Sequence, residues 1–106
     1  MPKFLWHGSY TPEGVKSLIT DGGTQRRADV EKLIQNAGGT VEHVYWGFGE
    51  DDIYVIADLP DNVSAGAISL AVARVGLLRV KTTVLLTAEE IDEATKRAEG
   101  FRPPGS

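Results

Sequence analysis

Residues 40–59 read TVEHVYWGFGEDDIYVIADL, and this stretch decides the predicted fold. Two runs rich in β-branched and aromatic residues, Thr40 to Phe48 and Ile53 to Leu59, flank the turn-forming sequence Gly49-Glu50-Asp51-Asp52. This pattern is typical of two antiparallel strands joined by a short connection. We therefore expect a β-hairpin at the centre of the chain.

The length of the turn sets the register of this hairpin. A two-residue or four-residue turn predicts that Trp46 faces Val55 and that His43 faces Asp58. Because side chains alternate along a strand, these two pairs lie on opposite faces of the sheet. One face is then wholly apolar, with Phe48, Trp46, Val44, Ile53, Val55 and Ala57. The other face is mixed.

The segments outside the hairpin alternate between strand and helix patterns. A Gly22-Gly23 pair interrupts the first helical pattern, and Arg26 and Arg27 follow it. We interpret this as a helix break with two solvated arginines rather than as an anion cradle. The predicted strands span residues 3–10 and 77–86, and the predicted helices span residues 11–37 and 64–75.

A last helix follows the fourth predicted strand, because Thr87 and Glu90 have the spacing of a capping box. The order is βαββαβ plus one helix, which is the ferredoxin-like α+β arrangement with a four-stranded antiparallel sheet. We expect residues 1–106 to form one domain, with an irregular tail at residues 100–106.

The mixed face of the predicted sheet is too aromatic to be left bare and too polar for a dry core. We therefore expect two copies of the chain to pair sheet against sheet in a two-fold homodimer, which can also be part of a higher homo-oligomer. The residues of this face are Leu5, His7, Ser9, His43, Tyr45, Tyr54, Ile56, Asp58, Arg79, Lys81, Thr83 and Leu85.

Composition narrows the function classes. The net charge is −4 and no long basic cluster occurs, which argues against binding to nucleic acid. The 106 residues contain no cysteine, which removes disulfides and thiolate chemistry. The N-terminal residues turn polar too early for a signal peptide, and no apolar run approaches the ~20 residues of a membrane span. We expect a cytoplasmic protein without a membrane segment.

The run from Phe48 to Ile56, followed by Leu59-Pro60-Asp61-Asn62, resembles the GYD domain family, named for a Gly-Tyr-Asp motif at this hairpin. Gly49 and Asp52 match the motif, and Asp51 stands at the position of the tyrosine. The likeness extends over nearly the whole chain. It implies a ferredoxin-like fold assembled as a dimeric α/β barrel, and it implies no particular reaction.

The candidate catalytic residues are His43, His7, Asp58 and Tyr45, all on the mixed face. A carboxylate beside an imidazole fixes its tautomer and raises its basicity, as a general base requires. His43 and Asp58 are the predicted pair, and His7 lies on the neighbouring strand. The alternative is an ordinary polar pair within a subunit interface.

Aromatic side chains on both faces are candidates for a ligand pocket, because they combine large contact area with a polar group. Tyr54 and Lys81 lie on the mixed face, whereas Trp6 and Trp46 lie on the apolar face, where they can equally be core residues. A pocket near the two tryptophans on the helix side stays open as an alternative.

These observations lead to a functional hypothesis without metal or cofactor. The chain is predicted to be a small-molecule-binding dimeric barrel, and a cofactor-independent enzyme if the His/Asp pair acts on an aromatic substrate. The alternative is a structural or interaction module whose sheet face serves oligomerisation alone.

Overall fold

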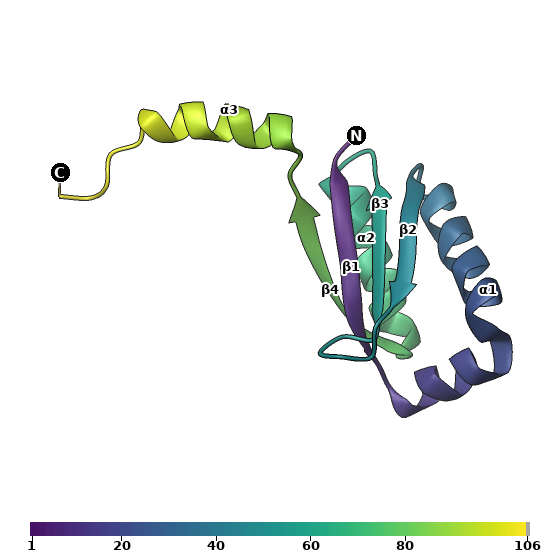
Figure 1. Cartoon of the computed structure of the whole chain (residues 1–106). Coiled ribbons are helices and arrows are strands. Elements are labelled where there is room, and N and C mark those ends of the chain that lie inside the picture. The colour runs from purple at the N-terminus through teal and green to yellow at the C-terminus, as the bar shows by residue number, and fades with distance from the viewer. Residues whose placement is uncertain (106) are drawn as a thin grey trace.

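The structure is a computed structural model that describes residues 1–105, and the predicted order βαββαβ plus one helix is confirmed (Figure 1). The strands are β1 (Lys3–Tyr10), β2 (Thr40–Trp46), β3 (Ile53–Asp58) and β4 (Leu78–Leu85). The helices are α1 (Pro12–Asn36), α2 (Asn62–Val75) and α3 (Ala88–Glu99).

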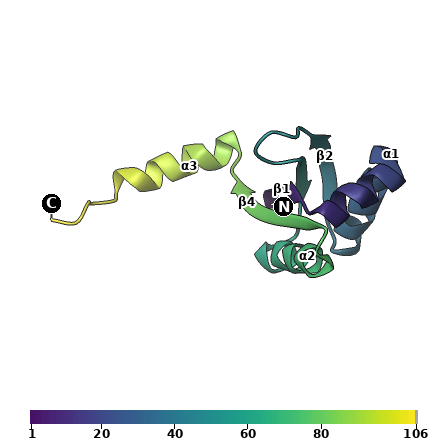
Figure 2. The ribbon, with the colours of Figure 1, turned by 90° about the horizontal axis from the view of Figure 1, so that it is seen from below.

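The four strands form one antiparallel sheet in the order β2-β3-β1-β4. Figure 2 shows α2 against one face of this sheet and the β2–β3 connection on the opposite side. Ile34 of α1 and Ile68 of α2 are both buried in the core that covers the first face. The fold is therefore α+β and ferredoxin-like, with one sheet face under helices and the other open.

The predicted division of side chains between the two faces is confirmed within the strands, whereas Phe48, predicted on the apolar face, lies in the β2–β3 connection and is 64% exposed. Phe4, Trp6, Val44, Ile53 and Val55 are all buried, and they belong to the apolar set. Their neighbours along each strand lie on the open face, where Tyr45 is 64% exposed. Strand alternation thus decides which residues enter the core.

The predicted register within the hairpin is wrong. Trp46 pairs with Ile53 rather than with Val55, and His43 pairs with Ile56 rather than with Asp58. The shift amounts to two positions along the strand, so each of these side chains keeps its predicted face. A β-bulge between Val41 and His43 displaces the pairing by one further residue.

The shift arises because the β2–β3 connection is longer than a tight turn. It begins at Gly47, whose N–H donates to the carbonyl of Asp52 at 3.0 Å. The loop then leans over β1, where the N–H of Asp52 donates to the carbonyl of Gly8 at 2.7 Å. The side chain of Asp52 accepts a hydrogen bond from the N–H of Tyr10 at 2.9 Å. These contacts with β1 replace the local turn that the register prediction assumed.

Helix α1 bends at Gly22, where the predicted break is found as a kink within one helix. Gly22 has φ 83° and ψ 169°, a conformation open to glycine and strained for other residues. Thr11 caps the start of the helix by accepting from the N–H of Gly14. Beyond the kink, Arg26 is only 14% exposed, so the prediction of a solvated arginine pair is wrong for this residue.

Helix α3 projects away from the sheet and carries the chain to a length of 57 Å (Figures 1 and 2). The predicted capping box is confirmed, because Thr87 and Glu90 each bond the other's backbone N–H. Every residue of α3 is exposed, Ile91 included. Within residues 1–105, no helix is both long and apolar enough to cross a membrane.

Candidate functional site

A polar cluster lies on the open sheet face, where the β2–β3 loop meets β1 and β4. Nδ1 of His7 lies 2.7 Å from Oδ2 of Asp51, and Nζ of Lys81 donates to Oδ1 of the same carboxylate at 3.0 Å. Nε2 of His7 lies 3.1 Å from the hydroxyl of Thr83. His7 and Lys81 are register partners in neighbouring strands, so the sheet itself brings them to one carboxylate.

Electrostatics hold the Asp51 carboxylate in its charged form. Its side chain is 8% exposed, and burial of an unpaired charge would be costly. The hydrogen bond with His7, and then the one with Lys81, lower the pKa of Asp51 below its ordinary value against the opposing effect of burial. Because an ionised carboxylate only accepts, the proton of the shared hydrogen bond belongs to Nδ1 of His7.

Contacts at both ring nitrogens and with a neighbouring aromatic ring hold the imidazole of His7. Both ring nitrogens have partners, and the ring stacks on Tyr54 with centroids 6.3 Å apart and an angle of 6° between the planes. Such an arrangement orients the ring and anchors the loop. It places the predicted residues His7, Tyr54 and Lys81 together.

The predicted pairing of His43 with Asp58 is wrong. Asp58 lies opposite Lys3 in β1, and its carboxylate accepts a hydrogen bond from that lysine at 3.0 Å. His43 is exposed and stacks on Tyr45, with ring centroids 5.7 Å apart. The physical reason is the two-position shift in the hairpin, which moves Ile56 opposite His43. The histidine and the carboxylate therefore do not form a pair.

A cavity of about 440 Å³ lies on the other side of the sheet, between α1, α2 and the strands. Its walls are mostly apolar, and its charged residues come from the helices. The lining consists of Trp6, Tyr10, Arg26, Asp29, Val30, Leu33, Ile34, Ile53, Val55, Ile68, Ala71, Val72, Arg74, Val75, Leu77, Leu78 and Val80. Of the predicted pocket residues, Trp6 lines this cavity.

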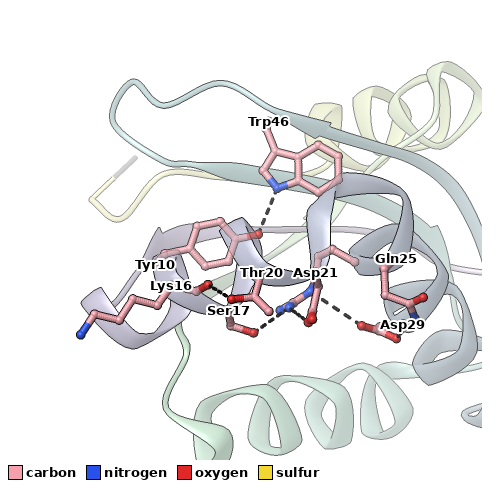
Figure 3. Close-up of polar contacts among 9 residues, drawn as sticks. Tyr10, Lys16, Ser17, Thr20, Asp21, Gln25, Asp29 and Trp46 are labelled. Atoms are coloured by element: carbon pink, nitrogen blue, oxygen red, sulfur yellow. Dashed lines mark hydrogen bonds and ion pairs between the residues drawn. The ribbon is translucent and has the colours of Figure 1, made fainter.

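Tyr10 provides a phenol to the cavity wall, and Trp46 holds it in place. Figure 3 shows the indole above the phenol, with Nε1 of Trp46 donating to the hydroxyl of Tyr10 at 3.0 Å. Burial raises the pKa of Tyr10 above its ordinary value, although the bond from Trp46 and the nearby charge of Arg26 oppose this effect. Trp46 does not line the cavity itself, but its hydrogen bond orients the phenol of Tyr10, which does.

Arg26 lies at the helical edge of the cavity within a set of carboxylates. Its Nη2 donates to the hydroxyl of Ser17 and to the carboxylate of Asp21, each at 2.9 Å. Its Nε lies 3.8 Å from a carboxylate oxygen of Asp29 (Figure 3). Two acidic side chains therefore balance the charge of this arginine.

Sequence reasoning missed Tyr10 and Arg26 as cavity residues and Asp51 as the carboxylate beside His7. Strand alternation carried a signal for Tyr10, because it shares a face with Phe4 and Trp6. The acidic turn carried a signal for Asp51, which sits at the tyrosine position of the motif that the chain resembles. No sequence signal pointed to Arg26, because its burial depends on tertiary packing.

The motif residues Gly49, Asp51 and Asp52 all lie in the β2–β3 loop or at its end. Asp51 and Asp52 attach the loop to β1, whereas a side chain at Gly49 would meet open space. Within residues 1–105, no three histidine or acidic side chains lie close enough together to hold a metal ion.

Comparison with known proteins agrees with the fold. No curated protein matches the chain. The model of the GYD domain matches residues 4–95 of the 106, which include β2, β3, β4, all of β1 but its first residue, and the loop just described. The chain belongs to the GYD domain family.

Proposed function

We propose that this chain binds a small apolar molecule in the cavity between α1, α2 and the sheet. The observation that carries the proposal is the cavity itself: about 440 Å³ of space with mostly apolar walls. Pockets that bind small organic molecules are typically about 300–1,000 Å³, apolar, and furnished with a few polar groups. Tyr10 and Arg26 supply such groups here.

The working form that we propose is a homodimer paired through the open sheet face. That face carries Tyr45 at 64% exposure beside His43, and within residues 1–105 no helix lies over it (Figure 2). A second copy would bury this aromatic surface in the manner of a two-fold interface. The absence of cysteine fits the reducing cytoplasm, which is the compartment that we propose.

The catalytic roles predicted for His43, His7, Asp58 and Tyr45 stay a prediction. These residues lie on the open face, whereas the proposed ligand lies under the helices, so a ligand in the cavity would not touch them. Acid–base chemistry would therefore need a second binding place between subunits. The alternative, a module whose sheet face serves only to join copies, assigns the same residues to the interface.

Binding of the neutral dye Nile red tests the proposal. We expect fluorescence to rise on binding, and we expect Val72→Phe, which fills the cavity wall, to weaken binding at least tenfold. Val63→Phe is the matched control, because Val63 lies on the same helix at 81% exposure and outside the cavity lining. Thermal unfolding verifies that both variants fold, since overpacking can destabilise a core.

Two results would reject the proposal. One is failure of the folded wild type to bind the dye or any molecule in a panel of apolar compounds. The other is equal loss of binding in both variants. A dimer that binds nothing in native mass spectrometry would favour the interaction module instead.

A further inference from the structure

Among the polar groups of the cavity wall is the phenol of Tyr10. This residue ends β1 and lines the cavity together with Trp6. Its hydroxyl oxygen already accepts the indole N–H of Trp46 at 3.0 Å (Figure 3). The orientation of the phenol is therefore set before any ligand arrives.

The phenol has a proton left to donate. A tyrosine hydroxyl can accept and donate at once, and within residues 1–105 no side chain or carbonyl accepts from Tyr10. Accepting the bond from Trp46 polarises the O–H group and makes it a better donor. Burial raises the pKa of Tyr10, so the proton stays on the oxygen at neutral pH.

The charged residues of the cavity wall are Arg26, Asp29 and Arg74. Arg26 is the cation that lowers the pKa of Tyr10, and it is shared between Asp21 and Asp29. The charge of Arg26 is therefore already balanced, so the phenol is the donor that we assign to a ligand. The rest of the wall near Tyr10 is aliphatic or aromatic, as at Trp6 and Val80.

We propose that the ligand is a neutral, mainly hydrocarbon molecule with a carbonyl oxygen that accepts a hydrogen bond from Tyr10. This inference rests on the proposed function and adds the chemical class of the ligand. Tyr10 is the specificity-determining residue, and Trp46 is a positioning residue that holds its oxygen.

Two probes with the same tricyclic skeleton test the inference. Fluorenone carries one carbonyl oxygen and fluorene carries none, so their difference in affinity isolates that oxygen. A hydrogen bond of ordinary net strength predicts that the wild type binds fluorenone about tenfold more tightly than fluorene. In Tyr10→Phe, we expect the two affinities to become equal while fluorene binds as before. Tyr45→Phe, on the opposite face, should retain the tenfold preference.

Infrared spectroscopy of bound fluorenone adds a readout that does not depend on any variant. Donation from Tyr10 weakens the C=O bond, so its stretch should move to lower wavenumber than that of fluorenone in hydrocarbon solvent. In Trp46→Phe, the shift should shrink, because the phenol loses its support.

The outcomes separate the two proposals. Equal affinity of the wild type for both probes, or an unshifted carbonyl stretch, overturns the inference and leaves the cavity as a binding site. A fluorenone preference that persists in Tyr10→Phe also overturns it. Failure of the wild type to bind either probe overturns the inference, and the proposed function falls with it only if Nile red and the panel of apolar compounds also fail to bind.

Discussion

Nδ1 of His7 lies 2.7 Å from Oδ2 of Asp51, and this contact anchors the β2–β3 loop to the centre of the sheet. The carboxylate also accepts from Lys81 of β4, so one buried side chain joins the loop to two strands. A buried carboxylate needs such partners, because its desolvation is otherwise uncompensated. Asp51 therefore holds the loop in position, and its two partners keep its carboxylate ionised.

The lowered pKa of Asp51 makes the stability of the chain depend on pH. A carboxyl whose pKa in the folded state lies below its ordinary value of 3.8 stabilises the fold above that pH. This contribution disappears as the pH falls through the folded pKa. We expect the wild type to exceed Asp51→Asn in free energy of unfolding at pH 7, and the gap to close towards pH 3. Urea denaturation at several pH values measures both.

Glu99→Gln is the control for this experiment, since Glu99 is an exposed carboxylate at the end of α3. Other acidic groups, such as the helix cap Asp61, are present in both the wild type and Asp51→Asn. Their effects therefore cancel from the difference in free energy of unfolding. A gap between the wild type and Asp51→Asn that stays the same from pH 7 to pH 3 would contradict the prediction.

The two histidines should respond differently to removal. His43 is exposed and stacks on the ring of Tyr45, so His43→Ala should change the free energy of unfolding by no more than about 0.5 kcal/mol. His7→Ala should destabilise the chain more, because Asp51 loses its shortest hydrogen bond. Amide exchange of residues 47–52 should also quicken in His7→Ala alone. Equal effects of both substitutions would count against the anchoring role.

Sequence patterns predicted the order of elements and the face of each strand residue, because both depend on local periodicity. Trp46 and Val44 are on the core side, and His43 and Tyr45 are on the other, as alternation requires. The register was beyond such reasoning. It depends on contacts of the β2–β3 loop with β1, which lies far away in the sequence.

The candidate site was likewise predictable only in part. The composition of the open face was predictable, but the partner of each polar group was not, since Asp58 pairs with Lys3 and Asp51 pairs with His7. The cavity depends on how far α1 and α2 stand apart over the sheet. No periodicity in the sequence encodes that separation.

Burial predicts how much two leucine-to-alanine substitutions should lower the stability of the chain. Leu59 is fully buried after β3, so Leu59→Ala should lower the free energy of unfolding by about 2–5 kcal/mol. Leu70 is 74% exposed on α2, and Leu70→Ala should cost no more than about 0.5 kcal/mol in the monomer. Urea denaturation followed by tryptophan fluorescence measures both. Similar losses in the two variants would place the core elsewhere.

The proposed dimer predicts the effect of a charge on the open face. Tyr45→Glu should raise the dissociation constant of the dimer at least tenfold, because a carboxylate would replace an exposed aromatic side chain within the proposed interface. Val63→Glu, on α2 and away from that face, should leave it unchanged. Sedimentation velocity over a concentration series measures the constant. A wild type that is monomeric throughout would refute the dimer itself.

The proposed dimer also predicts a partner for helix α3. It has 12 residues, all exposed, and an isolated helix of that length is only marginally stable in water even with a capping box. If α3 packs on a second copy, its amides should exchange slowly in the dimer and rapidly after dilution to the monomer. Ile91→Glu should make exchange in residues 88–99 rapid at both concentrations, whereas Lys96→Glu on the charged side should not. Exchange that is slow in the monomer would show that α3 is stable without a partner, and would remove it from the interface.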